Sequence, residues 1–222
     1  MAATEFSTDI AADRARALEL VPVSREIAGR LDRFVEFLIE RAQHTNLIAR
    51  STIPSVWTRH IADSLQLLAL APGARSWVDL GSGAGFPGLA LAAAIADQPG
   101  AIVHLVESIG KKAAFLREAA DVIGGEVVVH NVRIEDFVKN FVKTPDVVCA
   151  RALAPLDELL RLAHPLLERG AQGLFPKGQD VGAELTRASK YWNIEADLVP
   201  SKTSKASRIV VVRRLSKRSR KS

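Results

Sequence analysis

A glycine-rich segment is the part of the sequence best suited to binding a ligand. It reads Asp79-Leu80-Gly81-Ser82-Gly83-Ala84-Gly85-Phe86-Pro87-Gly88 and stands between an apolar run and a helical pattern. Glycines let the backbone turn tightly and approach a ligand closely, and Pro87 suits the first turn of a helix. The next apolar run ends in Glu107, where a carboxylate can accept hydrogen bonds from both hydroxyls of a ribose. The two features together predict binding of a nucleoside-containing cofactor.

Two cofactor classes share parts of this pattern. Gly83, Gly85 and Gly88 satisfy G-x-G-x-x-G, the fingerprint of proteins whose helix N-terminus receives the pyrophosphate of a nicotinamide or flavin dinucleotide. Asp79 and Gly81 extend it to D-x-G-x-G-x-G, the first motif of Rossmann-like methyltransferases that use S-adenosylmethionine (AdoMet). AdoMet carries an ammonium group and no pyrophosphate, so a carboxylate at the strand end attracts AdoMet and repels a dinucleotide. The longer pattern favours AdoMet, with a dinucleotide-dependent oxidoreductase and a glycine turn without ligand as alternatives.

Short apolar runs alternate with helical patterns around this segment, which predicts a parallel sheet covered by helices on both faces. The expected strands are 77–80, 102–106, 127–130, 147–150 and 171–175, and the expected helices are 87–96, 111–122, 156–167 and 181–190. Two further runs, 194–199 and 209–212, have no helix between them and predict an antiparallel pair that ends the sheet. Helical patterns at 24–42 and 53–69 precede the sheet. The predicted fold is α/β and Rossmann-like, mostly parallel with an antiparallel final strand and an N-terminal helical extension.

Length and composition agree with one large domain. The chain has 222 residues, of which 48% are hydrophobic and 25% charged, which allows one sizeable core and excludes collagen, coiled coil and wholesale disorder. No linker rich in Pro, Ser or Gly separates the first helices from the sheet. We therefore expect a helical lead-in at 1–72, a cofactor-binding domain at 73–214 and a basic tail at 215–222.

Charge and cysteine content indicate the compartment and the partner. The single cysteine, Cys149, excludes an internal disulfide framework and a cysteine-cluster metal site. The first residues lack the pattern of a secretory signal, and no apolar run is long enough to span a bilayer. We expect a soluble cytoplasmic protein. Residues 201–222 carry nine bases and no acid, which fits either a polyanionic partner or a tail that keeps the terminus soluble.

Beyond the glycine loop, the chain resembles the bacterial 16S rRNA guanine-N7 methyltransferase family known as RsmG or GidB. The resemblance covers roughly residues 45–179, and Gly-Phe-Pro-Gly at the end of the first motif is its most specific part. Ala150 and Thr45 depart from it, because a serine and an aromatic residue are common at these positions. The segments that carry it are Asn46-Leu47, Arg59-His60-Ile61-Ala62-Asp63-Ser64, Asp79 to Gly88, Glu107-Ser108, Gly110-Lys111-Lys112, Phe115-Leu116, Arg151-Ala152 and Lys177-Gly178-Gln179.

The resemblance implies a set of AdoMet-binding residues. They are Gly81 and Phe86 in the loop, the main chain at Ile134 and Glu135 after the third strand, and Arg151 after the fourth, in addition to Asp79, Gly83 and Glu107 from the motif itself. Arg151 is also the expected catalytic residue, since a guanidinium there can hold the methionine carboxylate or face the incoming base. The implied partner is 16S rRNA in the small ribosomal subunit.

The residues after the fourth strand bear on the chemistry. Enzymes that methylate an exocyclic amine usually carry an Asn or Asp followed by Pro-Pro-aromatic there, whereas this chain has Ala150-Arg151-Ala152-Leu153-Ala154-Pro155. Methylation of pyrimidine carbon 5 needs a nucleophilic cysteine, and Cys149 lies in an apolar run, as an inert buried residue does. Guanine N7 has a free lone pair and no proton to lose, so its methylation needs no general base. A guanine N7 acceptor therefore agrees with these residues.

Three residues outside the cofactor motif are candidates for binding RNA: Arg59, His60 and Lys177. Each can instead be a solvated or capping charge. His60 and Asp63 stand three residues apart on a helix, but two ligands without a third favour a hydrogen bond over a metal site, so we expect no metal. Trp57, Trp77 and Trp192 are expected in the core. We expect a monomer, and a non-catalytic RNA- or ribosome-binding module with the same fold is a further alternative.

Overall fold

The computed structural model describes residues 2–218 and the side chains of residues 9–218. Its helical elements are α1 (Ala2–Leu20), α2 (Arg25–Ala42), η1 (Arg50–Ser55), η2 (Trp57–Ala62), α3 (Asp63–Leu65), η3 (Gln66–Leu70), α4 (Gly88–Ile95), α5 (Gly110–Ile123), α6 (Ile134–Asn140), α7 (Leu156–Glu168) and α8 (Val181–Ala188). Its strands are β1 (Ser76–Leu80), β2 (Ile102–Val106), β3 (Val127–His130), β4 (Val147–Cys149), β5 (Gln172–Lys177), β6 (Trp192–Pro200) and β7 (Arg208–Lys217).

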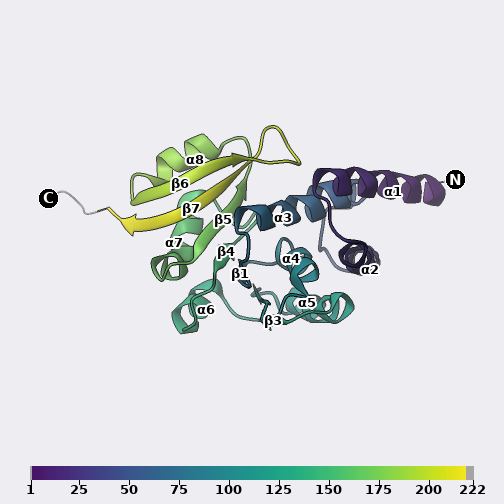
Figure 1. The fold of residues 1–222 in the computed structure, drawn as a ribbon, viewed down its shortest axis with the longest axis horizontal. Coiled ribbons are helices and arrows are strands. Elements are labelled where there is room, and N and C mark those ends of the chain that lie inside the picture. Colours follow the sequence, from purple (N-terminus) through teal and green to yellow (C-terminus); the bar gives the residue numbers. More distant parts are fainter. Residues whose placement is uncertain (1, 219–222) are drawn as a thin grey trace.

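The strands form one sheet in the order β3-β2-β1-β4-β5-β7-β6. Strands β1 to β5 pair in parallel, and β7 pairs antiparallel with both β5 and β6. This confirms the predicted fold class, including the antiparallel pair that ends the sheet. Figure 1 shows α1 and α2 at one end of the molecule and β6, β7 and α8 toward the other.

Helices cover both faces of the sheet because successive strand residues point to opposite faces. Trp77 and Val147 belong to a core shared with α2, α4 and α5. Their neighbours Val78 and Val148 belong to a second core shared with α6, α7 and α8. The N-terminal helix α2 thus packs into the same core as the sheet.

The helix expected over 53–69 is present but irregular. It consists of the 3-10 helix η1, the π-helix η2, one turn of α-helix and the 3-10 helix η3. Pro54 lies inside η1 and has no N–H to donate, which accounts for irregular hydrogen bonding at this point. The chain turns away after it at Pro72-Gly73, as the sequence predicts.

Three elements differ from the expectation. Helix α1 lies within the expected helical lead-in at 1–72, but no helix was predicted over its residues. Helix α6, just after β3, is missing from the predicted elements because its seven residues are too few to show a helical period. Strand β7 continues to Lys217, so the tail expected at 215–222 begins inside a strand, where Leu215 is buried and pairs with Ile194. The end of that tail, residues 219–222, lies outside the described residues. None of the helices from residue 2 to residue 218 is long and apolar enough to cross a membrane.

Candidate active site

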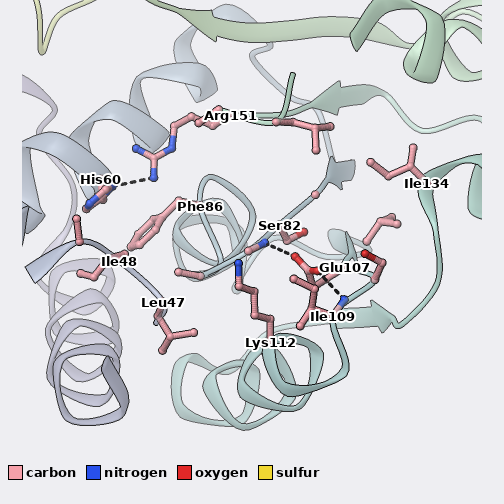
Figure 2. A pocket seen from close by; sticks show the side chains of 18 of the residues that line it. Leu47, Ile48, His60, Ser82, Phe86, Glu107, Ile109, Lys112, Ile134 and Arg151 are labelled. Atoms are coloured by element: carbon pink, nitrogen blue, oxygen red, sulfur yellow. Dashed lines mark hydrogen bonds between the residues drawn. The ribbon is translucent and has the colours of Figure 1, made fainter. Parts of the chain in front are cut away.

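A cavity of about 640 Å³ opens at the carboxyl ends of β1, β2 and β4, the edge where parallel α/β sheets bind ligands. One side is lined by the glycine loop, by Glu107 to Ile109 and by Arg133 to Glu135. The other side is lined by the N-terminal segment around Leu47 and Ile48 together with His60 and Arg151. Figure 2 shows these side chains converging on one space.

The glycine loop is held by the neighbouring strand and shaped by glycine geometry. The backbone N–H groups of Gly81 and Ser82 donate to the carbonyl of Val106 at 2.9 and 3.0 Å. Gly81 has a φ of 73°, and a Cβ there would lie 2.6 Å from Cδ1 of Leu153, which also lines the cavity. A side chain at Gly81 is therefore strained in its backbone and collides with the cavity wall.

Asp79 lies beneath the loop and does not line the cavity. Its side chain is fully buried, and Oδ2 accepts a hydrogen bond of 3.0 Å from the N–H of Gly88 at the start of α4. Burial raises the pKa of Asp79 to about 7, against the opposing effect of the Gly88 hydrogen bond. In this structure Asp79 fastens the loop to α4, and the expected contact with the ammonium group of AdoMet stays a prediction.

Glu107 lies in the cavity wall with its carboxylate fixed. Oε2 accepts from the N–H of Gly83 at 3.0 Å and Oε1 accepts from the N–H of Ile109 at 2.7 Å. Each carboxylate oxygen has a second lone pair, which is available to the hydroxyls of a ribose. The geometry fits the predicted role of Glu107.

Ile134 and Glu135 begin helix α6 and line the far end of the cavity. The first N–H groups of a helix have no partner within the helix, so they can donate to an acceptor such as an adenine ring nitrogen. The Glu135 side chain is half-exposed and lies 3.5 Å from the guanidinium of Arg161. The main chain, as the resemblance implies, is the part of this segment suited to the cofactor.

Arg151 and His60 on the opposite wall pack against Phe86, which comes from the end of the glycine loop. The Arg151 guanidinium donates to the carbonyl of Arg59 at 3.0 Å and to Nδ1 of His60 at 2.7 Å. The His60 ring stacks on Phe86 with a centroid distance of 4.9 Å, and the guanidinium lies 5.3 Å from the centroid of the Phe86 ring. Phe86 thus gives the cavity an apolar surface that tolerates a cation.

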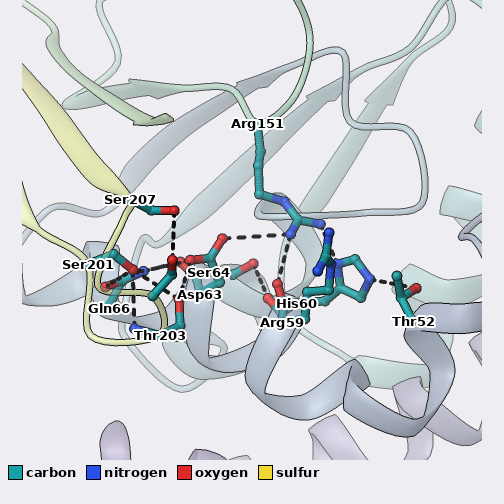
Figure 3. A network of polar contacts seen from close by, with 11 residues as sticks. Thr52, Arg59, His60, Asp63, Ser64, Gln66, Arg151, Ser201, Thr203 and Ser207 are labelled. Atoms are coloured by element: carbon teal, nitrogen blue, oxygen red, sulfur yellow. Dashed lines mark hydrogen bonds and ion pairs between the residues drawn. The ribbon is translucent and has the colours of Figure 1, made fainter. Parts of the chain in front are cut away.

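His60 is a neutral member of this cluster. Burial, together with the charges of Arg151 and Arg59, lowers the pKa of His60 to about 3. Because a guanidinium can only donate, Nδ1 is the acceptor. Nε2 then donates to Oγ1 of Thr52 at 3.3 Å. Figure 3 shows this chain from Arg151 through His60 to Thr52.

The π-helix η2, which carries Arg59 and His60, is fixed by a buried acid from α1. The side chain of Asp13 is 1% exposed, and its Oδ2 accepts from the N–H groups of Trp57 and Thr58 at 2.9 and 3.0 Å. Unpaired N–H groups at the start of a helix need such acceptors. The position of His60 in the site therefore depends on α1.

The three candidate RNA-binding residues differ in exposure. Arg59 is exposed and lines the cavity. His60 is 8% exposed and is engaged by Arg151. Lys177 lies outside this cavity, where its Nζ is 2.7 Å from Oε2 of Glu184 and donates to the carbonyl of Ala154 at 2.8 Å. Arg59 is the member of the three whose side chain is exposed for an external phosphate.

Several lining residues were not among the sequence candidates, notably Ile48, Thr52 and Lys112. Asn46-Leu47 and Lys111-Lys112 stood out only as parts of the resemblance. Thr52 gave no signal of its own, because its role depends on a contact with His60 eight residues later.

The structure also shows the environment of the cysteine, of the three tryptophans and of the residue types that bind metals. Cys149 is fully buried, and burial raises the pKa of its thiol well above the usual value, so it is not a nucleophile. Trp57, Trp77 and Trp192 are buried, as expected. Between residues 9 and 218, the His, Cys, Asp and Glu side chains form no group of three or more that could hold a metal ion.

Sequence comparison decides the family. The family model described as rRNA small subunit methyltransferase G matches residues 27–211. The chain belongs to this family. A relative named ribosomal RNA small subunit methyltransferase G from Bradyrhizobium sp. strain BTAi1 is 59% identical over 203 residues, which are 91% of each chain. A relative of the same name from Nitrobacter hamburgensis is 56% identical, over 95% of this chain and 81% of its own.

Comparison with solved structures shows that the chain has the fold of class I AdoMet-dependent methyltransferases. An O-methyltransferase from Bacillus cereus, solved in complex with S-adenosylhomocysteine, superposes with a TM-score of 0.61 at 15% identity, over 94% of this chain and 100% of that one. A ribosomal protein L11 methylase from Lactobacillus delbrueckii gives a TM-score of 0.53 at 15% identity, over 70% and 78%. The glycine loop, the fixed Glu107 and the apolar wall around Phe86 fit AdoMet as the cofactor of this enzyme.

Proposed function

We propose that this protein methylates N7 of a guanine in 16S rRNA of the small ribosomal subunit. When bound, AdoMet supplies an electrophilic methyl group: the N7 lone pair forms the new N–C bond, the S–C bonding pair stays on sulfur, and no proton is released. The chain's own residues hold the two reactants in line, which is the main requirement of such a displacement.

The residues after β4 carry the choice of acceptor. Where amine methyltransferases usually place an Asn or Asp, Arg151, Ala152 and Leu153 line the cavity. An arginine and two apolar side chains offer no acceptor for the hydrogens of an amine. His60 has Nδ1 occupied by Arg151 and is hard to protonate. This part of the wall suits a nucleophile that needs no base.

The residues that line the cavity divide between binding AdoMet and binding RNA. Glu107 accepts the ribose hydroxyls of AdoMet, the main chain at Ile134 and Glu135 meets the adenine edge, and Gly81 and Gly83 let the backbone approach. Phe86 covers the sulfonium side, and Arg151 faces the incoming base. Arg59 contacts RNA phosphate, while His60 and Lys177 act chiefly by holding Arg151 and the loop after β4. The enzyme works in the cytoplasm as a monomer. Light scattering of the purified protein tests the monomeric state.

Ligand-dependent thermal stability tests the cofactor. A ligand that binds the native state raises the melting temperature, so S-adenosylhomocysteine and AdoMet should raise it and NAD should not. A shift with NAD alone would favour an oxidoreductase. Incubation with AdoMet and 16S rRNA or small subunits, followed by mass spectrometry of RNase fragments, should then show one N7-methylguanosine. Methylation on an amine or a ribose would overturn the proposal.

The pH dependence of the single-turnover rate tests the absence of a base. We expect a nearly flat profile across the range in which guanine N1 stays protonated and the protein stays folded. A true general base contributes about 100-fold or more and leaves its pKa in the profile. His60→Ala and Glu135→Ala should lower the affinity for RNA or AdoMet without adding or removing a titration step. A rate that rises tenfold per pH unit and is abolished by one such variant would contradict N7 chemistry.

A further inference from the structure

A second cavity, of about 650 Å³, adjoins the cofactor cavity. The two share Arg59, Arg151 and Ala152 in their walls. The methyl group passes from one reactant to the other across a few ångströms, so the two reactants must lie side by side. A cavity that shares Arg151 with the cofactor site is adjacent enough to hold the second reactant.

The charges around this second cavity are uneven. Among its described lining residues there are five cations and one carboxylate: the cations are Arg16, Arg59, Arg151, Lys177 and Arg208, and the carboxylate is Asp63. Cations suit the phosphates that flank a nucleotide. A lone carboxylate among them weakens phosphate binding, so its presence points to a different kind of contact.

The two oxygens of Asp63 are in different situations. Oδ1 accepts from Oγ1 of Thr203 at 2.7 Å and from Nε2 of Gln66 at 2.9 Å, so both of its lone pairs are engaged. Oδ2 forms an ion pair with Arg151, whose Nη1 lies 3.7 Å away, and this distance is longer than a hydrogen bond. The Asp63 side chain is 16% exposed. Oδ2 is therefore an acceptor held in the wall beside Arg151.

The loop between β6 and β7 sets this orientation. Gln66 accepts from the N–H of Lys202 at 2.8 Å and donates to Oγ of Ser201 at 3.2 Å. Thr203, in the same loop, donates to Asp63. Figure 3 shows these side chains on one side of Asp63 and Arg151 on the other. The loop thus presents Oδ1 with donors and leaves Oδ2 toward the cavity.

The order of groups along the wall matches the order of groups around guanine. Arg151 lines both cavities and Asp63 lines only the second, so from the cofactor cavity outward the wall presents the Arg151 guanidinium first and the Asp63 carboxylate after it. Guanine presents N7, then the O6 acceptor, then the N1–H and N2–H donors. A guanine with N7 toward the cofactor places O6 at a donor and N1–H and N2–H at an acceptor.

From this correspondence we infer that the second cavity is the pocket of the target guanosine, and that Asp63 reads its N1–H and N2–H groups through Oδ2. This rests on the proposed function. Adenine has an acceptor at N1 and is repelled by the same oxygen, so Asp63 determines specificity. The positive charge that moves to the purine during transfer is also stabilised by a carboxylate next to N1–H.

A guanosine-to-inosine comparison tests the assignment. Inosine keeps N7, O6 and N1–H and lacks the N2 amine. Once the methylated guanosine has been mapped, 16S rRNA carrying inosine at that position can be made by ligation. For the wild type we expect kcat/KM to fall about tenfold with inosine, since one hydrogen bond to a charged acceptor is lost.

The Asp63→Asn variant should remove this discrimination. Thr203 and Gln66 both donate to one oxygen, so they fix the amide with its carbonyl oxygen toward them and its NH₂ at the Oδ2 position. That NH₂ then faces the N1–H and N2–H donors of guanine, so kcat/KM on guanosine should fall about a hundredfold. The ratio of kcat/KM on guanosine to kcat/KM on inosine should fall to about one. Thr203→Val keeps the carboxylate and should keep a ratio well above one. Asp97→Asn, which removes an exposed carboxylate paired with Arg30, should match the wild type.

The outcomes separate the two levels of the proposal. Asp63→Asn could lose kcat/KM equally on guanosine and inosine and so keep the guanosine-to-inosine ratio of the wild type. That result would show that Asp63 only positions Arg151, and it would overturn this inference alone. A wild type that does not form N7-methylguanosine would overturn the proposed function and the inference with it. The stabilisation of Asp63→Asn by S-adenosylhomocysteine shows that the variant is folded and binds the cofactor product.

Discussion

The two walls of the cofactor cavity are built in different ways. The glycine loop wall is made of contacts that the loop backbone forms within one βαβ unit: Gly83 N–H donates to the Glu107 carboxylate, and Gly81 N–H donates to the Val106 carbonyl. The Arg151 wall is made of side chains from three distant parts of the chain, joined as Thr203 to Asp63, Asp63 to Arg151, and Arg151 to His60. The first wall fits the cofactor, and the second lies between the cofactor and the second cavity.

This difference teaches which kind of change each wall tolerates. A loop that binds with its backbone fails when a side chain fills its space, whatever the chemistry of that side chain. A network that binds with charged side chains fails when one partner is removed, because the others remain buried and unpaired. Substitutions on the two walls should therefore separate cofactor binding from methyl transfer.

The largest effect is expected from Gly81→Val. Valine there has a φ that β-branched residues avoid, and its Cβ collides with Leu153. We expect the rise in melting temperature with S-adenosylhomocysteine to disappear. Gly182→Val, at an exposed glycine with open space around it, should keep the full rise. A normal rise in Gly81→Val would mean that the cofactor does not bind against this loop.

Arg151→Ala tests the opposite wall. It removes the donor to His60 and the cation beside Asp63. We expect the single-turnover rate to fall about 100-fold, the order of magnitude for losing a donor that acts in the transition state. The affinity for S-adenosylhomocysteine should change less than the rate. Arg213→Ala, which breaks an exposed ion pair with Asp197, should do neither. A loss confined to cofactor affinity would assign Arg151 to the methionine carboxylate instead.

The same difference explains what could be predicted from the sequence. Strand Val127–His130 and the glycine loop were predicted residue for residue because their signals are local: an apolar run in one case and consecutive glycines in the other. Glu107 was found because strand spacing places it at the same sheet edge. The burial of Asp79 away from the cavity was not foreseen, since a motif gives residue types but not the direction of a side chain.

The Arg151 wall was predicted only in part. Arg59, His60 and Arg151 were identified through the resemblance, but their mutual contacts were not. Thr203 lies 140 residues from Asp63 in sequence, and no periodicity in the sequence relates two such positions. The π-helix η2 was also missed, because its pattern of apolar residues reads like that of an ordinary α-helix. Long-range side-chain partners require the fold before they can be named.

The free energy of unfolding should depend on pH through His60, which belongs to the Arg151 wall. Its pKa of about 3 in the native state lies below the ordinary value of 6.5. The unfolded state therefore takes up a proton that the native state does not, and stability falls as the pH drops from 6.5 toward 3, by up to about 1.4 kcal/mol per pH unit. Urea unfolding at pH 5 and pH 7.5 measures this loss. His60→Gln should show a smaller loss than the wild type, and an equal loss would show that His60 takes up its proton as readily in the native state as in the unfolded state.

Asp79 should respond to pH with the opposite sign. Its pKa is raised from 3.8 to about 7, so the native state keeps a proton that the unfolded state releases. Stability from this group falls as the pH rises from about 4 to 7 and is level above that. Relative to the wild type, Asp79→Asn should therefore gain stability between pH 5 and pH 7.5. If the difference between the two proteins is constant with pH, Asp79 is ionised throughout.

The smallest effect concerns two cations of the second cavity, Arg59 and Lys177. Arg59 is exposed, whereas the Lys177 side chain is 10% exposed and is paired with Glu184. Removing one phosphate contact lowers the slope of log K against log salt by about 0.9 on duplex-like RNA. We expect this change of slope in Arg59→Gln and no change in Lys177→Met. The measurement is the affinity for RNA at salt concentrations from about 50 to about 300 mM, the range in which counterion release is usually followed.

Lys177→Met should slow methyl transfer without changing the slope, because Lys177 also donates to the carbonyl of Ala154 next to the loop that follows β4. Equal changes of slope in both variants would show that RNA displaces Glu184 from Lys177, and that this wall reorganises when the substrate binds.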